Sequence, residues 1–177
     1  MTALTWNEVA IAKSHDRGRF DCGDIELNIY IQRYARQNHQ RGAAKCFVAA
    51  PSDQPEMIMG YYTISPGSIE HARTPAVLAK GLGAYEVPVF RLGRLAVDKS
   101  VQGRGLASSL LFRAGVRCMQ VAEEIGGVGL LIDAKNDDVA LWYEIHGALR
   151  LLDAPLSLIL PFTMIAEALQ RFGLATV

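Results

Sequence analysis

Residues 94–107 read Arg94-Leu95-Ala96-Val97-Asp98-Lys99-Ser100-Val101-Gln102-Gly103-Arg104-Gly105-Leu106-Ala107. They begin with the alternating pattern of a β-strand, continue through a polar turn, and end with two glycines that open a long amphipathic helix. The first N–H groups of a helix lie at the positive end of its dipole and attract phosphate, and glycine lets the backbone approach such a ligand closely. The stretch therefore predicts a phosphate-binding turn. On spacing alone, an ordinary strand-to-helix turn remains the alternative.

Two common phosphate-binding motifs do not fit this turn. A Walker A loop needs Gly-Lys-Ser/Thr after a first glycine and four further residues, and the sequence has no such run. A Rossmann fingerprint needs an acidic residue for the ribose at the end of the next strand, but Val128–Asp133 leads into Ala134-Lys135-Asn136. A dinucleotide site is therefore disfavoured.

The segment Gln102–Ala107 resembles the Gln/Arg-x-x-Gly-x-Gly/Ala signature of the GNAT acetyltransferases, whose main-chain amides at this turn bind the pyrophosphate of acetyl-CoA. A later motif of that superfamily also has a counterpart, formed by Asn136, Ala140, Trp142-Tyr143 and Gly147. The resemblance implies an α/β GNAT fold with a mixed central sheet of about six to seven strands flanked by helices. It also implies a single N-acetyltransferase domain over residues 1–177.

The same resemblance implies roles for individual residues. The pantetheine arm of acetyl-CoA would pair with the strand, the turn would bind the pyrophosphate, and Tyr143 would act as general acid toward the departing thiolate. A phenol with a pKa near 10 is protonated at neutral pH and suits that role. The residues implied to bind acetyl-CoA are Leu95, Ala96, Val97, Gln102, Gly103, Arg104, Gly105, Leu106, Ala107 and Asn136. From helical spacing alone, Tyr143 would be a core aromatic, and no residue stands out as a general base.

A narrower resemblance runs from about His15 to Pro161, to the GNAT toxins of bacterial type II toxin–antitoxin modules. It rests on Phe20-Asp21-Cys22-Gly23, Leu27-Asn28-x-Tyr30, Gly60-Tyr61-Tyr62-Thr63-Ile64-Ser65 and Leu92-Gly93-Arg94-Leu95-Ala96-Val97-Asp98. It implies acetylation of the α-amino group of aminoacyl-tRNA, which blocks translation, together with a ribbon-helix-helix antitoxin and a homodimer. Ala148-Leu149 departs from the Gly-Phe usual in that family, which concerns the packing at the end of the helix before it.

Charge is balanced overall, with 18 basic and 18 acidic side chains, which argues against a general nucleic-acid-binding protein. Between Lys13 and Lys45, however, seven basic residues face four acidic ones. Basic residues gathered in one region are typical of a surface that binds an RNA backbone. From charge alone a solvated helix face is the commoner explanation of such a cluster, and the resemblance to the toxins favours the RNA surface. The residues predicted to contact tRNA are Arg17, Arg19, Arg33, Arg36 and Arg41.

Cysteine usage and hydropathy predict a cytoplasmic protein without a metal or a membrane span. Cys22, Cys46 and Cys118 lie far apart, without metal-ligand spacing, and are predicted to be buried reduced thiols. The longest apolar stretches are too short to span a membrane, and the N-terminus has no signal-peptide pattern.

Hydrophobic periodicity and turn residues predict a succession of strands and helices in one domain. Strands are expected over 5–12, 46–50, 57–65, 90–98, 128–134, 149–152 and 156–160, and helices over 25–40, 75–79, 106–125, 138–146 and 162–172. Asp24 is expected to cap the first helix, and Asn136 or Asp137 the fourth. The apolar stripe of the first helix is expected to be Leu27, Ile31, Tyr34 and Ala35. The strands over 46–50 and 57–65 are expected to form a hairpin, and Pro66-Gly67 to end its second strand.

Three functions compete at this point. The first is a toxin that acetylates aminoacyl-tRNA. The second is an acetyltransferase for a small amine or a protein N-terminus, which would act on free amines. The third is a non-catalytic regulator that binds acyl-CoA, which the presence of both Tyr143 and the complete turn disfavours.

Overall fold

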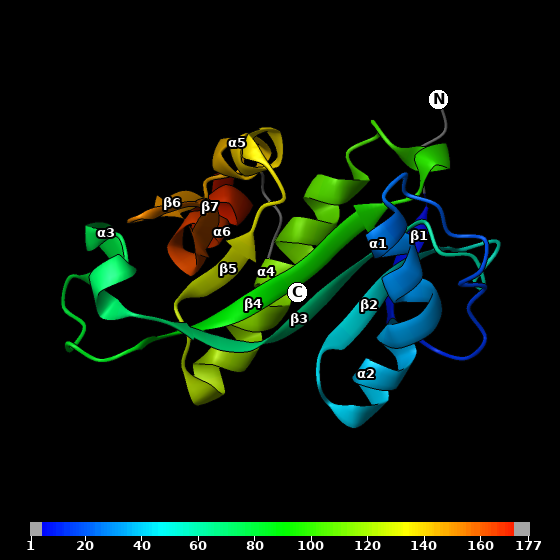
Figure 1. Cartoon of the computed structure of the whole chain (residues 1–177). Coiled ribbons are helices and arrows are strands. Elements are labelled where there is room, and N and C mark those ends of the chain that lie inside the picture. Colours follow the sequence, from blue (N-terminus) through cyan, green and yellow to red (C-terminus); the bar gives the residue numbers. More distant parts are fainter. Residues whose placement is uncertain (1–4, 172–177) are drawn as a thin grey trace. The chain divides into compact units, whose positions relative to one another are not determined.

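The structure, a computed structural model, describes residues 5–171 of the chain. In these residues seven strands form a mixed sheet in the order β1-β2-β3-β4-β5-β7-β6 (Figure 1). The strands are β1 (Trp6–Ala10), β2 (Lys45–Pro51), β3 (Gly60–Ile69), β4 (Val87–Val97), β5 (Gly129–Asp133), β6 (Leu149–Leu151) and β7 (Ala154–Pro161). The α/β class and the mixed sheet of about six to seven strands are confirmed.

Helical segments connect the strands. They are α1 (Ile25–Ile29), the π-helical turn η1 (Tyr30–Tyr34), α2 (Ala35–Arg41), the 3-10 turn η2 (His71–Arg73), α3 (Ala76–Ala79), the 3-10 turn η3 (Lys99–Val101), α4 (Leu106–Ile125), α5 (Asp137–Ile145) and α6 (Phe162–Arg171). The predicted end of the last helix at Phe172 lies outside the described residues. Within residues 5–171, no helix is both long and apolar enough to cross a membrane.

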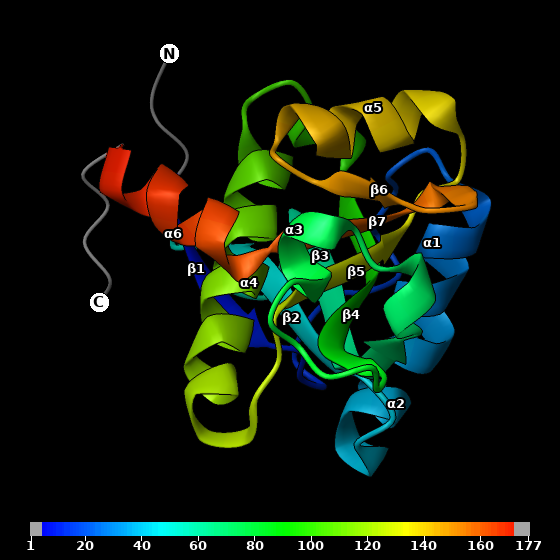
Figure 2. The ribbon, with the colours of Figure 1, turned by 90° about the vertical axis from the view of Figure 1, so that its left-hand side faces the viewer.

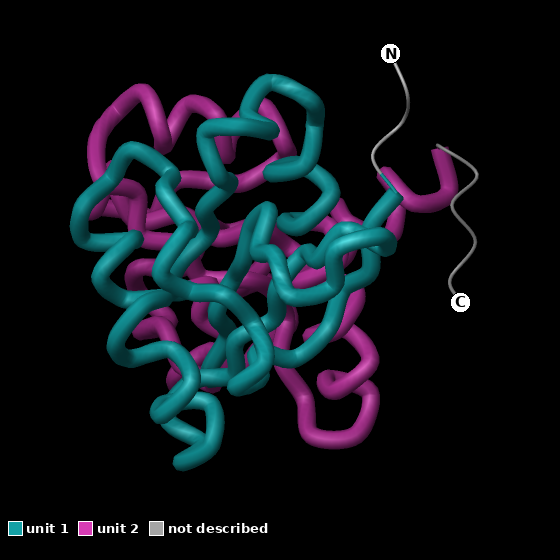
Figure 3. The backbone as a smooth tube through the Cα atoms, turned by 90° about the vertical axis from the view of Figure 1, so that its right-hand side faces the viewer, with its two compact units in different colours: residues 1–65, 93–111 teal, residues 66–92, 112–177 magenta. Residues whose placement is uncertain are grey.

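The chain divides into two compact units, drawn in different colours in Figure 3. Unit 1 comprises residues 1–65 and 93–111, and unit 2 comprises residues 66–92 and 112–177. Each unit has a hydrophobic cluster of its own. The single domain over residues 1–177 stays a prediction.

In unit 1, the antiparallel strands β1, β2 and β3 carry helices on both faces. The segment α1-η1-α2 covers one face through Ile31 and Ala35, which are fully buried. The start of α4 covers the other face, where a Cβ on Gly60 would lie 2.9 Å from Leu110 Cδ1 and 3.0 Å from the Ala96 carbonyl oxygen. Position 60 therefore favours glycine, because the Ala96 carbonyl belongs to the strand backbone and cannot move away cheaply.

The first helix begins where the sequence predicts, because the Asp24 side chain accepts hydrogen bonds from the N–H groups of Glu26 and Leu27. Its middle, however, is the π turn η1 rather than continuous α-helix. A π turn adds a residue to the turn and shifts the following side chains around the helix axis. The predicted apolar stripe is therefore wrong at Tyr34, whose side chain is 52% exposed, while Tyr30 is buried in its place.

Strand β3 does not stop at Pro66-Gly67, contrary to the prediction, but runs on to Ile69. Its last pair with β2 is Lys45↔Ile64, so no β2 residue opposes Pro66. A proline lacks the N–H group that a ladder needs, and it is tolerated where that group would have no partner strand. The end of β2 therefore explains why the proline does not end β3.

In unit 2, strands β5 and β7 form an antiparallel pair that carries β6 on its outer side. A Cβ on Gly129 would lie 2.6 Å from the Leu160 carbonyl oxygen, so this pair requires glycine there. The hydrophobic cluster joins Val87 and Val89 of β4 to Leu131 and Ile159. Figure 2 shows α5 alongside the β6–β7 hairpin.

Candidate functional site

The predicted phosphate-binding turn lies in unit 1 between the end of β4 and the start of α4. Gly103 and Gly105 have φ angles of +75° and +82°, and a Cβ on either would meet no atom within 4 Å. Such left-handed angles near a helix start turn successive N–H groups toward one point, as in anion-binding backbone nests. In the described part of the chain, the N–H groups of residues 103–107 donate no turn or loop hydrogen bond. The turn is therefore open on the side where an anion would bind.

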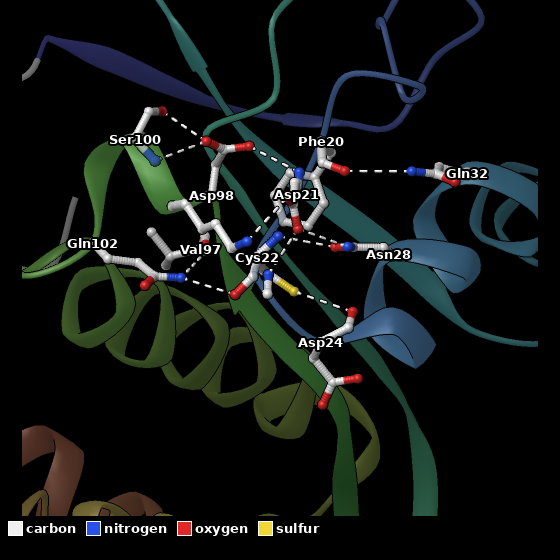
Figure 4. A network of polar contacts seen from close by, with 12 residues as sticks. Phe20, Asp21, Cys22, Asp24, Asn28, Gln32, Val97, Asp98, Ser100 and Gln102 are labelled. Carbon is white, nitrogen blue, oxygen red and sulfur yellow. Dashed lines mark hydrogen bonds and ion pairs between the residues drawn. The ribbon is translucent and has the colours of Figure 1, made fainter.

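A network of polar contacts fixes this turn to the loop before α1 (Figure 4). The Gln102 amide nitrogen donates to the carbonyl oxygens of Val97 and Cys22, at 2.9 and 3.0 Å. Asp98 caps η3 by accepting from the N–H and hydroxyl of Ser100, and its second oxygen accepts from Asp21 N–H at 2.9 Å. The turn is therefore held in place before any ligand arrives.

At the loop before α1, hydrogen bonds of Asp21 and Asn28 complete the network. The Asn28 oxygen accepts from Cys22 N–H, and its NH₂ group donates to Asp21 Oδ1, each at 2.9 Å. Hydrogen bonds from Asn28 and Gly23, together with Lys99 3.2 Å away, lower the pKa of the exposed Asp21 carboxyl. These residues lie far apart in the sequence, so periodicity gave no signal of the network, although the Phe20-Asp21-Cys22-Gly23 and Leu27-Asn28 motifs supply its members.

Gly93 and Arg94 lie in the second half of β4. A Cβ on Gly93 would lie 2.9 Å from Thr63 Oγ1, while the Arg94 guanidinium carbon lies 3.6 Å from the centroid of the Tyr30 ring. Thr63 and Tyr61 share a face of β3 because alternate residues do, and Tyr30 stacks on Tyr61. Position 93 and the Arg94 side chain therefore both lie near the face of β3 that carries Tyr61 and Thr63.

The parallel pairing of β4 with β5 ends at Leu92↔Ile132, whereas β4 itself runs on to Val97. Leu95 is half-buried, and Ala96 and Val97 are buried. The Val97 carbonyl accepts from the Gln102 side chain. An extended ligand could pair with the backbone here, and the predicted role of residues 95–97 toward the pantetheine arm stays a prediction.

In unit 2, α5 carries the predicted acid on its buried face. Asn136 caps the helix, its side-chain oxygen accepting from Val139 N–H at 3.0 Å, so that oxygen is already engaged. Tyr143 is 7% exposed and its ring lies edge-on to Trp142. Burial raises the pKa of the Tyr143 phenol above its ordinary value, which keeps the hydroxyl protonated. A protonated phenol can donate a proton and cannot act as a base.

Two other titratable side chains, His146 at the end of α5 and Glu86 just before β4, have hydrogen-bond partners. His146 Nδ1 hydrogen-bonds the Trp142 carbonyl at 2.7 Å and its ring packs on Trp142. Glu86 accepts from the Ser68 hydroxyl and is exposed.

The three cysteines differ in burial. Cys46 and Cys118 are buried, and burial raises the pKa of each thiol to about 12. Cys22 is only half-buried because it lies in a loop. The prediction of a buried thiol is wrong for Cys22.

The five arginines predicted to contact tRNA all belong to unit 1 and fall into two groups. Arg17 donates to the Gln32 carbonyl at 3.2 Å and Arg19 lies 4.0 Å from Asp16, so both have partners within the protein. Arg33 and Arg41 are exposed and Arg36 is half-buried on η1 and α2. The structure therefore makes Arg33, Arg36 and Arg41 the stronger candidates for RNA contacts.

Unit 1 also holds a pocket of about 200 Å³ beside η3, lined by Asp16, Arg19, Phe20, Glu56, Met57, Ile58, Asp98 and Ser100. Three carboxylates and one guanidinium line it, which does not suit an anionic ligand. In the described residues, no group of His, Cys, Asp or Glu is arranged to hold a metal ion.

Comparisons with known proteins agree on one kind of enzyme, although no family model matches the chain. The tRNA-acetylating toxin of Mycobacterium tuberculosis is 36% identical over 133 residues, which are 75% of this chain and 78% of that protein. A structure of AtaT complexed with acetyl-methionyl-tRNAfMet is 26% identical, with a TM-score of 0.86, and covers 92% of this chain and 98% of AtaT.

A second similar structure is a tyrosine-to-phenylalanine variant of AtaT, bound to the C-terminus of the antitoxin AtaR and acetyl-CoA. It is 24% identical, with a TM-score of 0.78, and covers 92% of this chain and 97% of the other. At that identity it establishes the shared fold alone.

Proposed function

The chain belongs to the family of tRNA-acetylating toxins, and from that premise we propose that it transfers acetyl from acetyl-CoA to the α-amino group of aminoacyl-tRNA. The observation that carries this function is the 36% identity to a tRNA-acetylating toxin over three quarters of the chain. Such a product has a blocked amino group, so it cannot form the next peptide bond and translation stops. The protein is therefore the toxin of a type II toxin–antitoxin module.

The open turn before α4 supports acetyl-CoA as the co-substrate. Residues 102–107 hold the pyrophosphate through backbone N–H groups at the positive end of α4, and Leu95, Ala96 and Val97 pair with the pantetheine arm. Gln102 contributes by fixing the turn, since its amide already binds two backbone carbonyls. The exposed Arg104 adds positive charge beside the phosphates.

The reaction breaks the thioester C–S bond and forms an amide C–N bond. The neutral amine attacks the thioester carbonyl, the amine loses one proton to water, and Tyr143 gives its phenolic proton to the departing thiolate. An α-amino group has a pKa near 7.7–8.0, lowered further by the neighbouring ester, so much of the substrate is already neutral at pH 7. A dedicated general base is therefore unnecessary.

Binding partners follow from the same family membership. A ribbon-helix-helix antitoxin holds the enzyme inactive, and the active form is a homodimer. Because aminoacyl-tRNA is made and used in the cytoplasm, the protein acts there.

The direct test incubates the purified protein with a pool of aminoacylated tRNAs and radiolabelled acetyl-CoA. Label should enter the tRNA fraction, and mild alkaline release should yield N-acetyl amino acids, because the ester bond is cleaved and the amide is not. Label transferred instead to free amines or peptides, with none on tRNA, would favour the general amine acetyltransferase. Binding of acetyl-CoA without any transfer would favour the regulator.

Reversing two charges on the first helix should weaken tRNA binding in a salt-dependent way. Each phosphate contact contributes about 0.7–0.9 to the slope of log affinity against log salt, so Arg33→Glu with Arg36→Glu should lower that slope by about 1.5. Filter binding of tRNA at several salt concentrations measures it.

Two control variants test whether the effect is specific to these two arginines. The double substitution to glutamine should have a smaller effect, and Lys80→Glu, an exposed position of unit 2, should have almost none. An unchanged salt slope in the double glutamate variant would assign these arginines to an ordinary solvated helix face.

A further inference from the structure

An aromatic side chain is presented to solvent at the π turn η1. Tyr34 is 52% exposed although its neighbours Tyr30 and Ile31 are buried. Its ring lies 6.5 Å from that of Tyr30, tilted by 36°. π turns are rare and occur often at functional sites. An exposed tyrosine held by one calls for an explanation other than packing.

Both the side chain and the main-chain carbonyl of Gln32 bind the π turn to the preceding loop. The Gln32 amide donates to the Phe20 carbonyl at 3.3 Å (Figure 4), and Arg17 donates to the Gln32 carbonyl at 3.2 Å. These bonds tie the turn to the same loop that holds the acetyl-CoA turn. The exposed ring of Tyr34 is thus presented by a braced segment, so little order has to be gained when a ligand stacks on it.

The guanidinium of Arg94 lies against Tyr30, the aromatic neighbour of Tyr34. Arg94 stacks on Tyr30 at 3.6 Å, within the range of a cation–π contact, and Tyr30 is itself stacked on Tyr61 with centroids 6.4 Å apart. Among the described residues Arg94 has no carboxylate partner, so its N–H donors are available. A stacked guanidinium is held flat, and its fork of donors fits a phosphate group.

We propose that Tyr34 stacks on an unpaired base at the single-stranded 3′ end of the substrate tRNA, while Arg94 binds a neighbouring phosphate. The inference rests on the proposed function and adds a specific binding site to it. Exposed aromatic rings interleaved with basic side chains are the usual means of holding single-stranded RNA. Tyr34 sits between Arg33 and Arg36, on a segment separate from the acetyl-CoA turn, which favours RNA over the adenine of acetyl-CoA as the source of the base.

Three variants of Tyr34 separate stacking from simple burial. Alanine substitution should raise the KM for aminoacyl-tRNA roughly five- to hundredfold, the range that base stacking gives in such experiments. Leucine keeps apolar bulk without a π face and should raise it nearly as much, whereas phenylalanine should keep the wild-type value. Because the side chain is half exposed, melting temperatures should stay close to wild type in all three.

The KM for acetyl-CoA in the same variants identifies the source of the base. It should not change if the base belongs to RNA. A rise in the KM for acetyl-CoA in place of that for tRNA would overturn the proposal and assign the stack to the cofactor adenine. A wild-type KM for tRNA in the alanine or leucine variant would overturn it as well.

Binding of uncharged tRNA tests the inference apart from the proposed function. The wild-type protein should bind full-length tRNA more tightly than tRNA that lacks its three terminal nucleotides, and Tyr34→Ala should lose that preference. This result would stand even if no acetylation of aminoacyl-tRNA were found. Equal affinity of the wild type for the two RNAs would overturn the stacking site.

Discussion

Replacing Tyr143 with phenylalanine is expected to lower kcat for aminoacyl-tRNA acetylation by roughly 10²–10⁴-fold, the contribution of a positioned general acid. The affinity for acetyl-CoA should stay nearly unchanged, because only a hydroxyl is lost. Steady-state kinetics with aminoacylated tRNA and calorimetric titration with acetyl-CoA measure the two quantities. The separation between them is the signature of a group used in the transition state rather than in binding.

The environment of Tyr143 explains why it acts as a donor. Burial raises its pKa above the usual value near 10, so the phenol stays protonated throughout the neutral and mildly alkaline range. The rate should therefore rise with pH as the substrate amine loses its proton, at a pH below the ordinary α-amino pKa of about 7.7–8.0 because of the neighbouring ester, and should not fall again below about pH 10. A decline between those values would indicate another acid with a lower pKa.

A second tyrosine provides the matched control. The hydroxyl of Tyr62 donates to Glu8 Oε1 at 3.1 Å, so Tyr62→Phe should cost about 1 kcal/mol of stability and leave turnover unchanged. Tyr143→Phe should do the opposite, because no hydrogen bond among the described residues uses its hydroxyl. Near-wild-type turnover in Tyr143→Phe would remove the acid assignment and return the residue to the core.

Local sequence signals predicted most of the elements around the candidate site. Two glycines after a strand, a capping Asp24 and an Asn136 before an apolar run each act within a few residues, and each appears in the structure as expected. Such signals depend on the conformational preferences of single residues and their immediate neighbours. These features can therefore be predicted from the sequence without knowledge of the tertiary structure.

Features that depend on contacts with residues distant in the sequence could not be predicted in this way. The π turn shifts the helix register at Tyr30, and no propensity marks it; only packing against Tyr61 and the brace at Gln32 reveal it. Pro66 stays within β3 because β2 ends before it. The contact of Asp98 with Asp21 spans 77 residues. Each outcome is decided by which strand or loop lies opposite, which a one-dimensional pattern does not contain.

Gly105→Val is the second substitution with a large expected effect, and it should weaken acetyl-CoA binding by at least about a hundredfold. Gly105 has a φ of +82°, which a β-branched residue cannot adopt without strain, so the start of α4 must rearrange. Two or more N–H groups would then no longer point at the pyrophosphate, and each hydrogen bond to a charged group contributes about 1.5–3 kcal/mol. Calorimetric titration of acetyl-CoA measures the loss.

Gly42→Val separates this effect from general backbone strain. Gly42 ends α2 with a φ of +75°, and a Cβ there, as at Gly105, would meet no atom within 4 Å. Each variant should therefore lose stability, by up to about 1–3 kcal/mol, the cost of holding a side chain in this region, which rearrangement of the backbone relieves. Only Gly105→Val should lose affinity for acetyl-CoA, because the N–H groups around Gly105, and not those around Gly42, border the predicted ligand. Equal affinities in the two variants would mean that the turn before α4 does not bind the pyrophosphate, whatever its conformation.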